Sequence, residues 1–289
     1  MIRPLVFLLL SALAGTAPLA AQTTEVRLDL KGGGQRIRVR TESLAPLGDR
    51  GARDLAVQAD DVLARDLTFS AVFTVDTPAM TAPSGDVQAI IGGTLTQKGN
   101  QLVLHGEAVD AASRKPIFTR DYPGAVTAWR SLVHQLADDL VMQFTGEPGV
   151  ASTRIAFVGA SRGSKELYVM DWDGWYVKPL THDRSIAQSP AWSPDGSLIL
   201  FTSYRGDQGP RIFVTPSAGG PVYLVSGRPG LNTSASYSPD GREIVCTLSQ
   251  DGNAEIYRLD ARGGEPRRLT TSRGIDTSPC WSPTGREIA

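Results

Sequence analysis

A serine flanked by glycines is the first residue whose type and spacing suggest chemistry. Gly159-Ala160-Ser161-Arg162-Gly163 matches the G-x-S-x-G pattern of serine hydrolases, in which the serine is a nucleophile at a sharp turn from a strand into a helix. Residues 166–170, which follow, have the composition of a strand and not of a helix. We therefore predict an ordinary hairpin here and no catalytic serine.

The histidines, cysteines and acidic residues are too scattered along the sequence to predict a catalytic or metal site. His105 alternates within a strand-like segment, His134 lies beside the apolar face of a predicted helix, and His182 falls in a loop. Two cysteines and three histidines are too few for a metal centre. Asp171-Trp172-Asp173-Gly174 has too few oxygen ligands for a Ca²⁺ loop, so we interpret it as a simple turn. We expect no catalytic residue, no metal and no cofactor.

Phosphate and nucleic-acid sites are also disfavoured. Gly32-Gly33-Gly34 lacks the Lys-Ser/Thr of a phosphate loop and is predicted to be a linker. Arg36, Arg38 and Arg40 share one face of a strand without interleaved aromatics, which indicates a solvated sheet face. The 29 Lys and Arg residues nearly balance 30 Asp and Glu residues, so the formal charge of −1 gives no reason to expect nucleic acid as a partner.

The beginning of the chain has the pattern of a secretory signal peptide. Arg3 precedes the apolar residues 5–10, and small residues follow. The apolar run is too short to span a membrane, and we predict cleavage near Ala21 and export of the mature chain. An exported chain could bridge Cys246 and Cys280, although both lie in apolar, strand-like runs where a free buried cysteine is the more usual state.

The second half of the chain repeats itself. Residues 192–196, 237–241 and 281–285 are versions of Trp-Ser-Pro-Asp-Gly, and their prolines are 45 and 44 residues apart. This motif fits a tight turn because Pro presets φ, Asp tolerates the third position and Gly suits the fourth. Two further sets of residues keep the same spacing: Tyr168, Phe213 and Tyr257, and Gly174, Gly219 and Gly263.

Each repeat is predicted to contain four short strands, as in the blade of a β-propeller. From Arg154 the chain supplies three strands of a first unit, two full units and the start of another, which is too little to close a ring. We therefore expect a C-terminally truncated propeller whose first unit lacks its innermost strand. In the middle unit the predicted strands are residues 189–192, 198–203, 211–215 and 222–225.

The first half is predicted to be a mixed sheet covered by helices. Residues 52–66 and 129–144 carry apolar residues at helical spacing, and Gly146 ends the second helix. The predicted fold is thus a two-domain chain, with an N-terminal α/β domain followed by an incomplete β-propeller. The expected divisions are a signal peptide at 1–21, the α/β domain at 22–148 and the propeller at 149–289. The strands of the α/β domain are expected at residues 36–40, 71–75, 87–95, 101–109 and 117–122.

These features together resemble the TolB family, the periplasmic components of the Tol-Pal system. The resemblance rests on the α/β domain, on Phe144-Thr145-Gly146 leading to Thr153-Arg154-Ile155-Ala156-Phe157-Val158, and on Ser189-Pro190-Ala191-Trp192 before the turn. The early strand at residues 36–40 departs from the family, in which it tends to be apolar.

The resemblance implies a non-enzymatic, monomeric adaptor without cofactors. Its six-bladed propeller, of which about three blades are present, would bind the lipoprotein Pal and so lie peripheral to the outer membrane. Its N-terminal segment would bind TolA, and the protein would support outer-membrane integrity and cell division. The residues expected to contact Pal are Ser189, Asn232, Ser234 and Thr277, and those expected to pair with TolA are Val26, Leu28 and Leu30.

Two other functions remain open from the sequence. Ser-Pro-Asp-Gly turns also occur in the propellers of prolyl-oligopeptidase-like peptidases, so a catalytic domain could follow Ala289. A ligand-binding propeller without protein partners is the second alternative.

Overall fold

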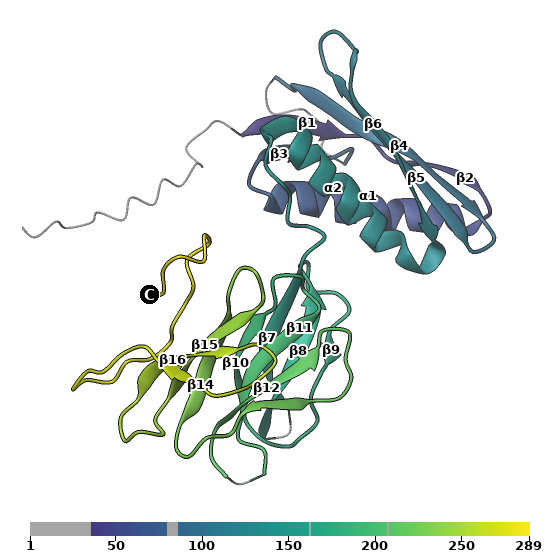
Figure 1. Ribbon diagram of the computed structural model, residues 1–289. Coiled ribbons are helices and arrows are strands. Elements are labelled where there is room, and N and C mark those ends of the chain that lie inside the picture. Colours follow the sequence, from purple (N-terminus) through teal and green to yellow (C-terminus); the bar gives the residue numbers. More distant parts are fainter. Residues whose placement is uncertain (1–35, 80–85, 162, 207) are drawn as a thin grey trace, which may run out of the picture. The chain divides into compact units, whose positions relative to one another are not determined.

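The computed structural model describes residues 36–79, 86–161, 163–206 and 208–289 (Figure 1). The predicted signal peptide and the segment with Val26, Leu28 and Leu30 lie outside the described residues. Within the described ranges, every helix is too short or too polar to cross a membrane.

The first half folds as the mixed sheet that the sequence predicts, in the order β3-β1-β4-β5-β6. β1 runs parallel to both β3 and β4, whereas β4, β5 and β6 form an antiparallel meander. A short strand that we did not predict, β2, runs parallel to β4 beyond the end of β1. The strands are β1 (Ile37–Thr41), β2 (Ala45–Gly48), β3 (Phe73–Asp76), β4 (Ala89–Lys98), β5 (Gln101–Asp110) and β6 (Pro116–Ala125).

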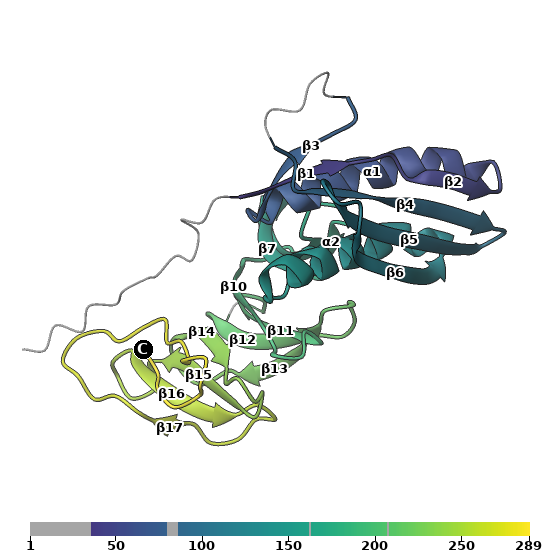
Figure 2. The ribbon, with the colours of Figure 1, turned by 90° about the horizontal axis from the view of Figure 1, so that it is seen from above.

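Both predicted helices, α1 (Gly51–Phe69) and α2 (Trp129–Thr145), pack against this sheet (Figure 2). Their apolar stripes form the core together with the inward side chains of the strands. A Cβ at Gly106 of β5 would lie 2.4 Å from Leu136, so the absence of a side chain there lets α2 approach the sheet. Gly146, at φ 75°, caps α2 in the left-handed conformation, as predicted.

The arginine-bearing strand β1 is less solvated than its sequence indicates. It lies between two neighbours, and Arg38 Nη1 is 3.3 Å from Asp76 Oδ1, whose side chain is only 3% exposed. Arg38 therefore compensates a buried carboxylate while its side chain stays 27% exposed on the predicted solvated face.

The second half forms three antiparallel sheets that resemble propeller blades. The first sheet has three strands and the next two have four, as the repeat predicts (Figure 1). Trp281 and Ile288 pair across an isolated bridge where a further unit begins. The strands are β7 (Arg154–Ser161), β8 (Ser164–Asp171), β9 (Lys178–Pro179), β10 (Ala187–Trp192), β11 (Leu198–Ser203), β12 (Arg211–Pro216), β13 (Tyr223–Ser226), β14 (Asn232–Tyr237), β15 (Glu243–Leu248), β16 (Glu255–Asp260) and β17 (Arg267–Arg268).

Apolar clusters join successive blades, and hydrogen bonds within the turn stabilise its conformation. Trp192 packs into a cluster shared by the first two blades, and Tyr237 into one shared by the second and third. In the turn after β10, Ser193 Oγ donates to Asp195 Oδ1 at 2.6 Å and accepts from the Leu198 amide at 2.9 Å. The turn chemistry therefore includes a serine-aspartate pair, in addition to the Pro and Gly preferences.

Candidate functional site

Three serines at one position of the repeat adopt an unusual backbone conformation. Ser189, Ser234 and Ser278 have φ values of 52°, 54° and 60°, in the left-handed region that costs non-glycine residues of order 1 to 3 kcal/mol. In β10 and β14 the strand pairing shifts by one residue around this serine, which makes it part of a β-bulge. Bulges and strained residues concentrate at functional positions because they turn a side chain away from the regular sheet.

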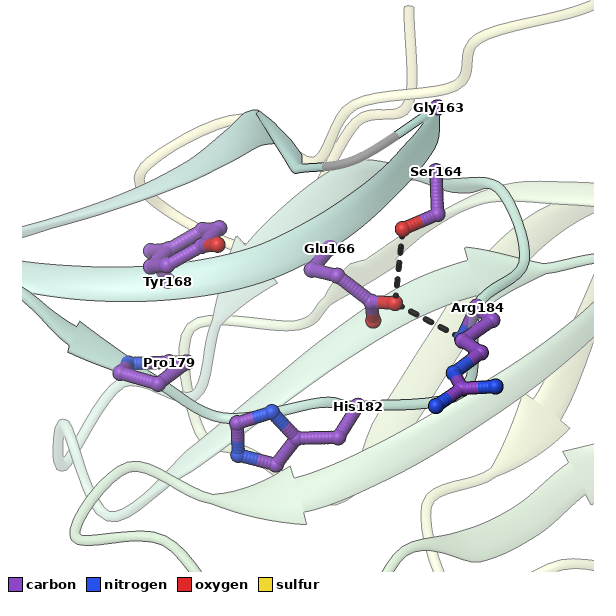
Figure 3. A pocket seen from close by; sticks show the side chains of 7 residues that line it. All are labelled: Gly163, Ser164, Glu166, Tyr168, Pro179, His182 and Arg184. Carbon is purple, nitrogen blue, oxygen red and sulfur yellow. Dashed lines mark hydrogen bonds between the residues drawn. The ribbon is translucent and has the colours of Figure 1, made fainter.

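The loop before the first of these serines is held by a buried glutamate. Glu166 of β8 accepts hydrogen bonds from the Thr181 hydroxyl at 2.6 Å, the Arg184 amide at 2.8 Å and the Ser164 hydroxyl at 3.2 Å. Figure 3 shows Ser164 and the backbone of Arg184 converging on this carboxylate. The loop of residues 181–185 is thus fixed to β8 just before it enters β10.

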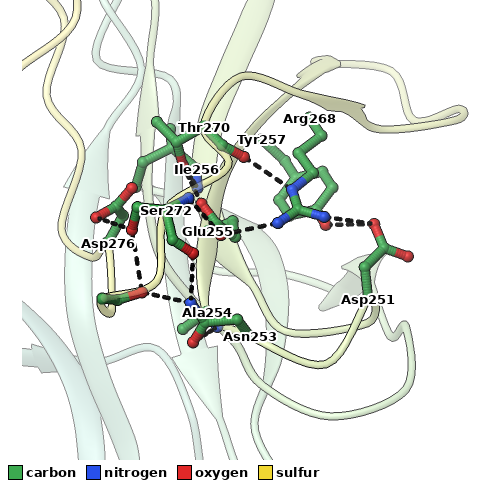
Figure 4. Close-up of polar contacts among 11 residues, drawn as sticks. Asp251, Asn253, Ala254, Glu255, Ile256, Tyr257, Arg268, Thr270, Ser272 and Asp276 are labelled. Carbon is green, nitrogen blue, oxygen red and sulfur yellow. Dashed lines mark hydrogen bonds and ion pairs between the residues drawn. The ribbon is translucent and has the colours of Figure 1, made fainter.

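Glu255 of β16 holds the corresponding loop two blades later. Its carboxylate accepts from the Thr270 hydroxyl at 2.6 Å and the Ser272 amide at 3.0 Å, and it pairs with Arg268 Nη2 at 2.8 Å (Figure 4). Ser272 also donates to Asp276 at 3.2 Å. These bonds hold the loop that leads to Ser278.

The loop that leaves the middle blade is held by an amide, that of Asn232 at the start of β14 in the third blade. Arg211 stands at the repeat position of Glu166 and Glu255, and the side chain of Asn232 holds the loop instead. Its Oδ1 accepts from Ser226 Oγ at 2.7 Å and from the Arg228 amide at 3.0 Å. Its Nδ2 donates to the carbonyls of Arg228 and Gly230. Each left-handed serine therefore follows a loop that a buried polar side chain anchors.

The two glutamates are held in their ionised form. Burial alone would raise the pKa of Glu166, but the hydrogen bonds from Thr181, Arg184 and Asp183 outweigh it, and the pKa lies below its ordinary value of 4.5. For Glu255, the bond from Thr270 lowers the pKa, burial opposes it, and Arg268 lowers it further. Ionised carboxylates make stronger hydrogen bonds than neutral acceptors, so these loops are firmly fixed near neutral pH.

An open pocket of about 810 Å³ lies beside the first glutamate (Figure 3). It contains His182, in the loop where the sequence placed it, but it does not present a nucleophile elbow. The serine-hydrolase motif forms the hairpin between β7 and β8, with Ser161 paired to Ser164, and another strand follows, as predicted. The residues that line the pocket are Gly163, Ser164, Glu166, Tyr168, Pro179, His182 and Arg184.

The four predicted contact residues on the repeats differ in exposure. Ser189 and Thr277 are exposed, Ser234 is half-buried and Asn232 is fully buried. Thr277 immediately precedes Ser278, so all four residues lie at or beside the bulges or their anchored loops. These residues therefore lie near the same end of neighbouring repeats.

Sequence reasoning missed Glu166, Glu255 and Ser278. Ser278 follows Ser189 and Ser234 at the repeat spacing, so the period itself could have identified it. The glutamates also keep the period, but Arg211 interrupts the series between them and conceals it.

The left-handed serines and the Ser-Pro-Asp-Gly turns lie at opposite ends of the blades. β10 begins just before Ser189 and ends at Trp192, where the turn starts. Arg154, the first residue of β7, donates to the carbonyl of Gly196 in that turn at 3.4 Å. The chain therefore enters the repeats at the turn end, and the anchored loops face away from that entry.

The thiols are free, with Cys246 buried and Cys280 exposed. Burial raises the pKa of Cys246 to about 12. The expectation of a buried free thiol in an apolar strand is confirmed for Cys246 and wrong for Cys280, which is exposed and lies outside the named strands.

Known proteins resemble this chain in both sequence and fold. The family described as TolB beta propeller domain matches residues 141–289. A TolB homologue from Chlorobium chlorochromatii is 34% identical over 69% of this chain and 44% of its own length. The Tol-Pal system protein TolB of Desulfosudis oleivorans is 35% identical over 63% of this chain and 41% of its own length. The matched segments thus cover less than half the length of these curated relatives.

A solved structure extends the likeness to the first half. TolB from Acinetobacter baumannii superposes with a TM-score of 0.76 at 25% identity, and the match covers 88% of this chain and 65% of that one. This coverage includes the mixed sheet as well as the blades. TolB proteins are non-enzymatic, periplasmic components of the Tol-Pal system, and this chain belongs to their family.

Proposed function

We propose that this protein is an adaptor of the Tol-Pal system that binds Pal through the anchored loops of its propeller and TolA through its N-terminal segment. It acts without a cofactor, as a monomer in the periplasm after cleavage of the signal peptide. It is linked to the outer membrane through Pal, and by joining these partners it supports outer-membrane integrity and constriction during division.

The observation that carries the Pal proposal is the recurrence of the left-handed serine after an anchored loop. The strained backbone recurs at one position of three successive repeats, and Asn232 of β14 holds the loop before Ser234 where a glutamate holds the other two loops. Loops held on a rigid scaffold suit recognition because little conformational entropy is lost on binding. The surface combines these polar groups with the exposed side chains of Ile186 and Ile275, which suits a protein partner that makes both hydrogen bonds and apolar contacts.

The four residues have different roles in this proposal. Ser189 and Thr277 are exposed and contact Pal directly. Ser234 contributes through its half-buried hydroxyl and the bulge backbone. Asn232 is buried, so it shapes the loop of residues 228–231 and does not touch the partner.

The TolA proposal concerns Val26, Leu28 and Leu30, which alternate with polar residues ahead of Gly32-Gly33-Gly34. An alternating segment that precedes a glycine hinge can add a strand to the exposed edge of a partner sheet. Main-chain hydrogen bonds would give affinity, and the three apolar side chains would give specificity.

Calorimetric titration of purified Pal into the protein tests the first half of the proposal. Thr277→Arg places a large charged side chain on the anchored loop and is expected to weaken Pal binding at least about tenfold. Tyr223→Arg is the matched control, because Tyr223 is 59% exposed on the outer strand β13. No binding by the unmodified protein, or equal losses in both variants, would refute the proposed surface.

A truncation tests the second half. A protein that lacks residues 22–30 is expected to lose TolA binding and to retain Pal affinity. If the truncated protein binds TolA as well as the complete one does, the N-terminal segment is not the TolA site.

A further inference from the structure

A buried group of ionisable side chains connects the two helices to the first blade. Asp66 lies on α1, Arg130 and His134 lie one turn apart on α2, and Asp173 lies in the turn after β8. The side chains of Arg130, His134 and Asp173 are 5%, 3% and 0% exposed, and Asp66 is 2% exposed. Charges this deeply buried must compensate one another, because each loses its hydration.

The hydrogen bonds leave one nitrogen without a partner. Asp66 accepts from Trp172 Nε1 at 3.1 Å, and its other oxygen lies 2.6 Å from His134 Nδ1. Arg130 Nε donates to Asp173 Oδ2 at 2.9 Å, and Arg130 Nη2 also contacts this oxygen. His134 Nε2 is buried without a hydrogen bond among the described residues, and Asp173 Oδ2 is 3.8 Å away.

The balance of charge assigns the state of His134. Two carboxylates and one guanidinium carry a net charge of −1, which a neutral imidazole would leave uncompensated in the interior. Because Asp66 accepts a hydrogen bond from Nδ1–H, a neutral imidazole would also direct the lone pair of Nε2 toward the carboxylate of Asp173. A second proton on Nε2 removes this repulsion, brings the cluster to zero net charge and attracts His134 to both carboxylates.

A metal ion fits the same place less well. Ligand atoms of Asp66, His134 and Asp173 lie within 4.8 Å of one another, a spacing that could hold a cation. However, both oxygens of Asp66 already accept hydrogen bonds, and the guanidinium of Arg130 lies on Asp173. A divalent ion would have to sit beside that guanidinium, so a proton is the cation that the cluster accommodates.

We propose that His134 is a proton-dependent latch, in which the doubly protonated imidazole bridges Asp66 of α1 and Asp173 of the first blade. Loss of the proton on Nε2 then releases the turn after β8 from the helices. This proposal is independent of the function proposed above.

The surroundings of the latch are consistent with this role. Trp172 packs against the core of the helices and Trp175 lies over Arg130, with 4.5 Å between the guanidinium carbon and the ring centroid. Asp171 on β8 and Arg154 on β7 are the other charged groups that face the cluster. Burial raises the pKa of Asp171, and the charges of His134, Arg154 and Arg130 act in the opposite direction.

Nuclear magnetic resonance of the ¹⁵N-histidine-labelled protein tests the protonation state directly. The expected spectrum shows His134 with both ring nitrogens protonated at neutral pH. A neutral imidazole at His134 under these conditions overturns the proposal. A stoichiometric bound metal, measured by elemental analysis of the same sample, also overturns it.

Hydrogen exchange tests the release of the turn. His134→Gln keeps a hydrogen-bonding side chain without the charge, and at neutral pH it is expected to speed exchange in residues 171–178 at least about tenfold. The control is His105→Gln, since His105 lies on β5 and pairs with the exposed Asp121. Asp173→Asn is expected to remove the imidazolium signature of His134 in the spectrum. Unchanged exchange in His134→Gln, or an unchanged signature in Asp173→Asn, contradicts the latch.

Discussion

The hydroxyl of Thr181 donates to the carboxylate of Glu166 at 2.6 Å, and two blades later Thr270 makes the same bond to Glu255 at the same length. In both blades the bond fixes the segment that delivers a left-handed serine to the next inner strand. The repeat therefore maintains a buried anchor as well as its visible turn motif. This anchor is the physical basis for a rigid surface of loops.

Acid should release these anchors. Because the folded-state pKa of Glu255 lies below its ordinary value, its contribution to stability is present above pH 4.5 and is lost as the pH falls through the lower folded pKa. Glu255→Gln should lower the melting temperature at neutral pH and flatten its decline below about pH 4.5. Melting curves followed by circular dichroism over this range, with Glu287→Gln at an exposed position as the control, should show the difference. Parallel declines in all three proteins would argue against ionised anchors.

The position of a left-handed serine should accept glycine better than a β-branched residue. At φ 54°, Ser234→Val should destabilise the fold by about 2 kcal/mol, whereas Ser234→Gly should change stability by less than about 1 kcal/mol. Urea unfolding measures both values. Ser236→Val in the regular part of the same strand is the control and should cost less than Ser234→Val. The reverse order of the two valine variants would mean that the bulge is not maintained in solution.

Only one thiol should react in the folded protein. Cys280 is exposed, whereas Cys246 is buried and its pKa is raised to about 12 by burial, so its reactive thiolate is scarce. A maleimide probe should add once to the native protein and twice in denaturant, as counted by mass spectrometry. Cys280→Ser should abolish the native reaction. Rapid labelling of both thiols in the native protein would contradict the burial of Cys246. A lack of labelling in denaturant without reductant would mean that the two thiols are not free.

The glycine of the repeated turn should resist substitution. Gly241 has φ 72°, and a Cβ there would lie 3.6 Å from Pro194 of the preceding turn. Gly241→Ala should therefore destabilise the protein by about 1 to 2 kcal/mol through backbone strain. Gly274→Ala is the control because Gly274 lacks a left-handed φ. Equal melting temperatures for the two variants would show that the turn relaxes without cost.

Local chemistry explains which parts of the fold were predictable. The strands of the middle blade lie within two residues of their predicted bounds, because Pro, Asp and Gly specify the turn and the period specifies the rest. The short strand β2 was not predicted, since its four residues are all exposed and carry no alternation. Its pairing depends only on the neighbouring β4.

Long-range contacts explain what could not be predicted about the site. Asp173 was interpreted as a turn residue, yet it pairs with Arg130, which lies 43 residues earlier in the chain. Likewise, asparagine is a common residue type in loops. Only the fold shows that the Asn232 amide holds the loop before Ser234, as Glu166 and Glu255 hold the loops before the other two serines. No spacing rule reveals such substitutions between unlike side chains.

Site-specific photo-crosslinking to Pal tests most directly whether the anchored loops are the binding surface. A photoreactive residue at Thr277, which is exposed next to the left-handed Ser278, should crosslink to Pal in the periplasm. The same residue at Tyr223, 59% exposed on the outer strand, should not. Crosslinks from Tyr223 with none from Thr277 would contradict the proposed surface.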